Sequence, residues 1–283
     1  MRIGVTGGSS AIGKTVIRKC RENGHEVVEF TRLITKSNQR YFDLVNDVFE
    51  IEVTDLDAML HLAWDRKLEK QSGLHVSVNT SKRLIDKCKE LKVNLVFLSS
   101  ISANAESESI YGRSKYLVEE YATKHGFGVV RSGVIWGGQM SGFIETLFKI
   151  SNLPLIKFLL LPDPVIQLTE EIALAGFLIE NVIKDDRSQS QVVFVNGDMR
   201  LSQILDVMTN RKHRMQLGLP VSIAYRFART LRTLGIPVPF DPDSLKSSTD
   251  AVTLQKSESN QLHGSLIPSY EFQNWIASVV SKK

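Results

Sequence analysis

Short apolar runs alternate with amphipathic segments through the first half of the chain. Strands are predicted at residues 3–6, 25–31, 58–62, 93–99 and 127–134, and helices at 11–22, 74–91 and 111–125. The helix at 74–91 rests on apolar residues at helical spacing: Leu74, Val78, Leu84, Ile85, Cys88 and Leu91. Because apolar strands that alternate with helices are typical of parallel sheets covered on both faces, the pattern predicts a doubly wound α/β fold.

The pattern loosens after residue 137, where loops, prolines and helix signals mix. An apolar helix at 169–183 and a strand at 191–195 are expected to return to the sheet. We therefore predict a sheet domain of residues 1–138 plus 165–197, and a smaller, discontinuous C-terminal part of residues 139–164 plus 198–283. The apolar stretch 143–162 is broken by charges and a proline, so we expect core packing and no stable membrane insertion.

Composition and charge narrow the range of functions. The chain has 283 residues, 42% of them hydrophobic and 23% charged, as in an ordinary globular protein. Strand-like residues begin at Arg2, and the two cysteines, Cys20 and Cys88, have no metal-binding spacing. We expect reduced thiols, no signal peptide, no metal and a cytoplasmic location.

Basic residues cluster between Arg200 and Arg232, where seven Lys or Arg side chains accompany one acid, Asp206. A solvated helix face explains this cluster, and attraction for an anionic group such as a diphosphate is the functional alternative. No recognition-helix or aromatic pattern accompanies the charge, so nucleic acid is not expected as a partner.

A glycine-rich turn, Thr6-Gly-Gly-Ser-Ser-Ala-Ile-Gly13, joins the first strand to the first helix. Glycines permit a tight turn there, and backbone N–H groups at a helix N-terminus bind pyrophosphate. The turn predicts a dinucleotide site made of Thr6, Gly7, Ser9, Ser10, Ala11, Ile12 and Gly13.

The end of the second strand bears on which dinucleotide binds. An acid there would bind both ribose hydroxyls, but this chain has Thr31 followed by Arg32. A guanidinium suits a 2′-phosphate, so NADP(H) is favoured, with NAD(H) as the alternative. In that alternative Arg32 is a surface residue or stacks on adenine.

Three polar side chains form the candidate catalytic group. Tyr111 and Lys115 are four residues apart and share one helix face, and Ser100 closes an apolar strand nearby. The ammonium favours the phenolate of Tyr111, which can exchange a proton with a substrate oxygen, while Ser100 orients that oxygen. We expect Lys115 also to bind the nicotinamide ribose.

Other polar residues suggest structural roles. His61 lies within an apolar strand and is interpreted as a hydrogen-bonded structural histidine. The acid pairs Glu119–Glu120 and Glu170–Glu171 are expected on the surface or at helix N-termini.

Taken in order, these motifs resemble the extended short-chain dehydrogenase/reductase family, in its nucleotide-sugar epimerase/dehydratase branch, over residues 2–138. Further parts of the resemblance are Phe42-Asp43-Leu44, His61-Leu-Ala63, and the segment from Arg131 to Gly137. The resemblance implies a Rossmann fold and a nicotinamide cofactor. It adds these cofactor-binding residues: Asp43, Leu44, Leu62, Ala63, Trp64, Asn79, Ser99, Gly133 and Val134.

The chain departs from the family pattern in three places. The middle glycine of the turn is replaced at Ser10 or Ala11, and the interval from Ser100 to Tyr111 is shorter than usual. Ser100 is followed by Ile101, not by the acid pair of the family's dehydratases, so dehydration is disfavoured.

The residues and the resemblance together predict an NADP(H)-dependent reductase of a keto-sugar nucleotide or a related carbonyl substrate. A nucleotide-sugar epimerase that retains NAD is the first alternative. A non-catalytic dinucleotide-binding sensor or assembly protein is the second, and contact of residues 153–161 with a membrane surface is a third possibility. The expected partner is a small molecule, and a homodimer is compatible with the family.

Overall fold

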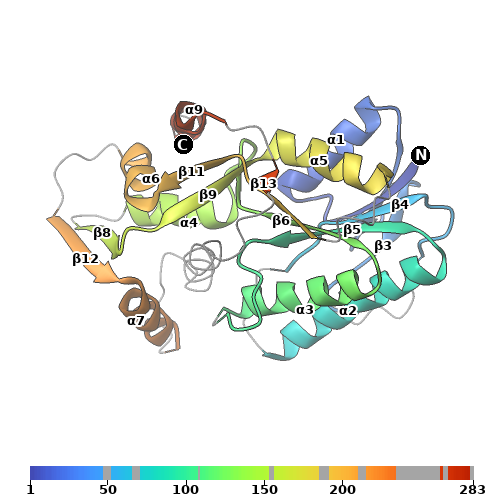
Figure 1. Ribbon diagram of the computed structural model, residues 1–283, viewed down its shortest axis with the longest axis horizontal. Helices are drawn as coiled ribbons and strands as arrows, with labels where there is room; N and C mark the ends of the chain where they lie inside the picture. Colours follow the sequence, from blue (N-terminus) through green and yellow to red (C-terminus); the bar gives the residue numbers. More distant parts are fainter. Residues whose placement is uncertain are drawn as a thin grey trace. The chain divides into compact units, whose positions relative to one another are not determined.

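The computed structural model describes residues 1–46, 52–65, 71–107, 109–152, 156–184, 191–209, 215–233, 262–263 and 267–280. The chain forms two compact units (Figure 1). Unit 1 consists of Met1–Ser132 and Glu171–Phe194, and unit 2 of Gly133–Glu170 and Val195–Lys283. The assignment of cofactor and substrate to separate parts of the chain stays a prediction.

Unit 1 contains a parallel sheet, which confirms the predicted α/β fold. Its described strands lie in the order β10 (Gln191–Phe194), β6 (Gly128–Ser132), β5 (Asn94–Ser100), β4 (Ala58–His61), β1 (Arg2–Thr6), β2 (Glu26–Thr31) and β3 (Gln39–Tyr41). Thr6 pairs with His61 in the register, His61 with Phe97, and Ser100 with Ser132. The polar residues that end these strands therefore meet along one edge of the sheet.

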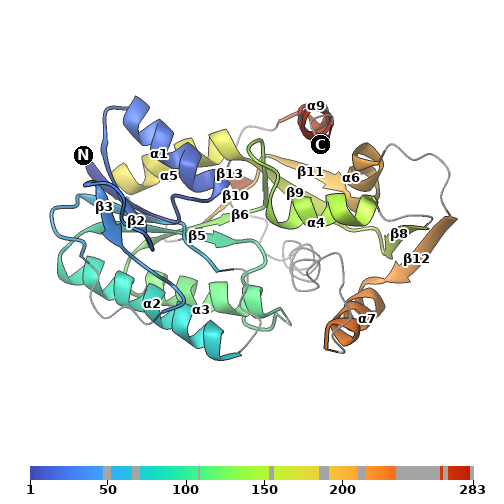
Figure 2. The same ribbon diagram turned by 180° about the vertical axis from the view of Figure 1, so that it is seen from behind.

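Helices cover both faces of this sheet. Helices α1 (Ala11–Glu22) and α5 (Glu171–Lys184) pack together on one face, and α2 (Gln71–Glu90) and α3 (Ile110–Lys124) on the other (Figure 2). Apolar strand residues such as Leu95 and Phe97 pack against Leu84, Ile85 and Cys88 of α2. From Val78 to Cys88 the predicted periodicity marks the buried face of α2, whereas Leu91 follows the end of the helix and is exposed. The side chain of Leu74 lies outside the described residues.

Unit 2 is built from smaller sheets. Strand β9 (Val165–Glu170) pairs in parallel with β7 (Val134–Trp136) and antiparallel with β11 (Gly197–Arg200). Strands β8 (Ile156–Leu161) and β12 (Met215–Pro220) form a separate parallel pair, and β13 spans Leu262–His263. The strand predicted over 127–134 is in fact divided at Gly133, because β6 and β7 pair in different sheets.

The helices of unit 2 are α4 (Gly142–Ser151), α6 (Leu201–Met208), α7 (Val221–Thr233) and α9 (Ser269–Val280). Its core contains Phe143, Ile144, Leu147 and Leu160, so these residues of the apolar stretch 143–162 pack inside the protein, whereas Leu161 is exposed. Within the described ranges, no helix is both long and apolar enough to cross a membrane.

Candidate active site

The glycine-rich turn is closed too tightly to admit side chains at two of its glycines. Gly7 has φ of +74°, and a Cβ atom there would lie 2.7 Å from the backbone nitrogen of Ala63. A methyl group on Gly13 would overlap the carbonyl oxygen of Gly7. The turn therefore brings the N-terminus of α1 close to the chain that follows β4.

Ser10 stands where the family pattern would have a glycine, and the structure gives it a local role. Its Oγ accepts a hydrogen bond from the Gly13 nitrogen at 3.1 Å and donates one to the Gly7 oxygen at 2.8 Å. Ser10 is the N-cap of α1, so the lost glycine is replaced by a side chain that stabilises the helix start.

The end of β1 is bonded to the end of β4 through Thr6 and His61. The Thr6 Oγ1 accepts hydrogen bonds from the Leu62 and Ala63 nitrogens, each at 3.0 Å, and lies 2.8 Å from His61 Nδ1. His61 Nε2 lies 3.0 Å from Ser81 Oγ. Burial, together with the Lys115 ammonium, lowers the pKa of His61 to about 3. His61 is thus a neutral, hydrogen-bonded residue, as expected.

Lys115 is buried at the same edge of the sheet. Its Nζ donates a hydrogen bond to the Leu98 oxygen at 2.6 Å, and lies 4.2 Å from the Trp64 ring centre and 4.5 Å from that of Phe97. Tyr111 meets the same Trp64 ring edge-on, with ring centres 6.4 Å apart. Trp64 therefore connects both members of the helical pair to the Ala63 backbone beside the glycine turn.

Ser100 is held by the short segment that leads from β5 to α3. Its Oγ lies 2.9 Å from Ser102 Oγ. The Ser102 carbonyl approaches α3 so closely that a Cβ on Gly112 would lie 2.5 Å from it. The first turn of α3, which carries Tyr111, is capped by Ser109, whose Oγ accepts from the Gly112 nitrogen at 2.9 Å. The described residues between Ser100 and Tyr111 thus pack closely against the start of α3.

The indole nitrogen of Trp64 is a buried donor that lacks a hydrogen-bond acceptor in the described part of the chain. A buried polar group without a partner is costly, and such groups suit a site that receives a ligand. Together with the close glycine turn and the backbone N–H groups at the start of α1, this donor fits a bound dinucleotide.

The predicted surface position of Glu119 is wrong. Its side chain is buried, and its carboxylate forms an ion pair with Arg131 at 2.6 Å. The same carboxylate accepts hydrogen bonds from Ser99 Oγ at 2.7 Å and Gln191 Nε2 at 2.8 Å. Glu171 is buried as well, and accepts a short hydrogen bond from Thr15. Both acids join elements of unit 1 that lie far apart in sequence.

Several other predicted residues have their side chains engaged locally. The Asp43 carboxylate accepts from the Val45 nitrogen at 2.9 Å and from Asn46 Nδ2 at 2.8 Å. Ser99 Oγ is used by Glu119, and Leu44 is part of the core. These contacts hold the ends of the strands.

The side chains of Asn79 and Arg32 are exposed, and neither side chain forms a hydrogen bond or ion pair with another described residue. Glu29, on the strand before Arg32, pairs with Arg21 at 2.8 Å. Gly133 and Val134 belong to unit 2, where the Gly133 nitrogen donates to Thr169 Oγ1 at 2.9 Å. Their contact with a cofactor stays a prediction.

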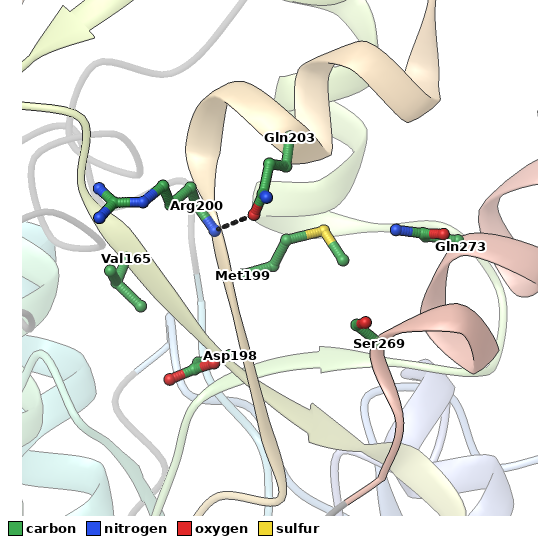
Figure 3. A pocket seen from close by; sticks show the side chains of 7 residues that line it. All are labelled: Val165, Asp198, Met199, Arg200, Gln203, Ser269 and Gln273. Carbon is green, nitrogen blue, oxygen red and sulfur yellow. Dashed lines mark hydrogen bonds between the residues drawn. The ribbon is translucent and has the colours of Figure 1, made fainter.

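Unit 2 has a cavity of its own, with a volume of about 310 Å³. It is lined by residues of β9, β11, α6 and α9: Val165, Asp198, Met199, Arg200, Gln203, Ser269 and Gln273 (Figure 3). Its polar side chains are one carboxylate, one guanidinium, two amides and one hydroxyl. In the described ranges, no cluster of His, Cys, Asp and Glu could hold a metal ion.

The comparisons with known proteins agree with this geometry. Residues 3–130 match the model of the NAD dependent epimerase/dehydratase family. None of the curated proteins compared with the chain matches it.

Solved structures resemble the chain over nearly its whole length. They include UDP-N-acetylglucosamine 4-epimerase from Bacillus cereus, with 18% identity over 91% of this chain and 97% of that one, and a TM-score of 0.61. The dTDP-4-dehydrorhamnose reductase from Yersinia enterocolitica has 15% identity over 99% and 98%, with a TM-score of 0.62. MoeE5 in complex with UDP-glucose and NAD has 16% identity over 90% and 99%, with a TM-score of 0.61. At these identities the likeness establishes the fold.

Proposed function

We propose that this chain, whose residues 3–130 match the NAD dependent epimerase/dehydratase family, is a nicotinamide-dependent oxidoreductase that acts on a nucleotide sugar. The observation that carries the proposal is the convergence of Tyr111 and Lys115 on Trp64, next to the glycine turn. A sensor would need the turn but would have no use for a proton donor beside it.

The residues have distinct roles in this proposal. The N–H groups at the start of α1 bind the pyrophosphate, and the cofactor supplies or accepts the hydride when bound. Tyr111 gives its phenolic proton to the substrate oxygen in the reducing direction and takes it back in the oxidising direction. Ser100 donates a hydrogen bond to that oxygen, and the Lys115 charge stabilises the phenolate left behind.

Net reduction with NADPH is the first choice for the reaction. Arg32 is exposed at the end of β2 and has no ion-pair partner in the described part of the chain, so its guanidinium is free to bind a 2′-phosphate. Glu29, the nearest acid on the strand, already pairs with Arg21. An epimerase that retains NAD is the alternative, and the description of the matching family supports it.

The substrate is proposed to be a keto-sugar nucleotide or a related carbonyl compound. Ser100 is followed directly by Ile101 and Ser102, so the acid pair that the family's dehydratases carry at this place is missing and dehydration is disfavoured. The basic stretch from Arg200 to Arg232 is a candidate for holding the diphosphate, although residues 210–214 of it lie outside the described residues.

The deciding experiment identifies any nicotinamide cofactor released when the purified protein is denatured, and titrates the cofactor-free protein with NADPH and NADH. We expect no retained cofactor and a preference for NADPH that Arg32→Ala removes. Arg18→Ala, which deletes an exposed arginine on α1, should leave the preference intact. Tyr111→Phe should abolish turnover and keep binding.

Other outcomes separate the alternatives. Tightly retained NAD would support the epimerase and would mean that Arg32 does not determine the choice of cofactor. Cofactor binding without turnover on a broad panel of nucleotide sugars would favour the sensor. Failure to bind either dinucleotide would refute the proposal.

A further inference from the structure

Helix α7 buries one face and leaves two large apolar side chains in solvent. Tyr225 and Ala228 are 4% and 2% exposed, so they fasten the helix to unit 2. Ile223 and Phe227 are 54% and 64% exposed, and their spacing of four residues places them side by side on the helix surface. An exposed apolar pair on an anchored helix indicates a surface that contacts something else.

The exposed face of α7 is also basic. Arg226 and Arg229 are exposed beside the apolar pair, and neither forms an ion pair with a described residue. The sequence from residue 215 to residue 233 contains three arginines and no acid. An amphipathic helix with large apolar residues next to arginines is the pattern of helices that lie in the headgroup region of a bilayer.

A third exposed apolar residue lies near the start of the helix. Leu161, at the end of β8, is 50% exposed and pairs in register with Pro220, the residue that directly precedes α7. Figure 1 shows α7 following directly from the end of β12. Leu161, Ile223 and Phe227, with Arg226 and Arg229, are called the α7 surface below.

We infer that the α7 surface binds peripherally to an anionic lipid bilayer. The guanidinium groups match lipid phosphates, and the apolar side chains reach the boundary between headgroups and acyl chains. A second copy of this chain fits less well, because a two-fold contact would place the same arginines of both copies opposite each other. The inference does not depend on the reacting groups proposed above, which lie in unit 1. It assigns Arg226 and Arg229, which belong to the basic stretch considered above for the diphosphate, to the bilayer.

The test is co-sedimentation of the full-length protein with vesicles of phosphatidylcholine, prepared with or without phosphatidylglycerol. We expect binding to the anionic vesicles that weakens as salt is raised. Two double variants test the surface: Ile223→Ser with Phe227→Ser, and Arg226→Gln with Arg229→Gln. Each should lower the partition constant by about tenfold or more, because membrane binding depends on both buried apolar area and charge.

Ile172→Ser is the matched control, because it removes a similarly exposed aliphatic side chain from α5. It should bind vesicles like the unchanged protein, and circular dichroism should show all variants folded. The inference is overturned if the unchanged protein does not bind anionic vesicles, or if either double variant binds them as well as the unchanged protein. A third outcome would also overturn it: the unchanged protein is a dimer that does not bind vesicles, and the Ile223→Ser, Phe227→Ser variant is a monomer.

Discussion

Replacement of Glu119 by Gln should strongly destabilise unit 1. The carboxylate accepts from Arg131 Nη2 at 2.6 Å and Nε at 2.9 Å, from Ser99 at 2.7 Å and from Gln191 at 2.8 Å. These partners lie on β5, β6 and β10, whereas Glu119 lies on α3. An amide has one acceptor oxygen in place of two and carries no charge to oppose the buried guanidinium.

The size of the effect follows from the burial of the pair. The side chains of Arg131 and Glu119 are 9% and 4% exposed. Loss of one partner from a buried ion pair costs about 3–5 kcal/mol, which lowers the folded-to-unfolded ratio by roughly 100-fold or more. Glu145 and Lys149 form an exposed pair at 2.9 Å on α4, so Glu145→Gln should cost only about 0.3–0.5 kcal/mol.

Urea unfolding followed by circular dichroism measures both free energies. The double variant Glu119→Leu with Arg131→Met should recover much of the loss, because removal of both charges eliminates the uncompensated one. Equal, small losses in Glu119→Gln and Glu145→Gln would refute the reasoning, since they would show that the Glu119 charge is not held in a dry environment.

Three further predictions concern buried groups and the turn. The pKa of His61 is lowered to about 3 by burial and by Lys115. As the pH falls below about 6.5, the His61 imidazole is therefore protonated in the unfolded chain but stays neutral in the folded chain. The neutral His61 stabilises the fold fully above pH 6.5, and the free energy of unfolding should fall by about 1.4 kcal/mol per pH unit as the pH drops toward 3. In urea unfolding, His61→Gln should flatten this pH dependence. An unchanged pH dependence would contradict the lowered pKa of His61. Burial raises the pKa of Cys20 to about 11 and that of Cys88 to about 12, so a thiol reagent at pH 8 should label both only after unfolding; rapid labelling of the native protein would count against the buried positions. Gly13→Ala should abolish dinucleotide binding because its methyl group would overlap the Gly7 carbonyl, whereas Gly176→Ala in α5 meets open space and should bind normally in the same titration.

The sheet, and the places of Ser100, Tyr111 and Lys115 on its elements, could be predicted because their signals are local. An apolar run that ends in Thr6 or Ser100 identifies a strand and the edge of the sheet where it ends. Tyr111 and Lys115 lie on one helix, so their shared face follows from their spacing. Parallel pairing then brings these segments together without any knowledge of long-range contacts.

The buried ion pair could not be predicted, because its partners belong to different elements. In the sequence, nothing distinguishes Glu119 from an exposed helix acid. Its burial depends on contacts with Arg131 on β6 and Gln191 on β10, which only the fold brings together. Glu171 and Thr15 are 156 residues apart and illustrate the same limit. Three-residue strands such as β3 were missed because so short a segment has no measurable periodicity.

The surroundings of Lys115 explain how its charge can act at the site. A carbonyl oxygen and two aromatic faces hold the ammonium, and these three partners are neutral. These three contacts orient the ammonium and add no opposing charge of their own, so they do not reduce its field at nearby groups. His61 responds to that field, since Lys115 contributes to the lowering of its pKa. A negative charge that forms on an oxygen next to Lys115 would be stabilised by the same field, as proton transfer from Tyr111 to a substrate requires.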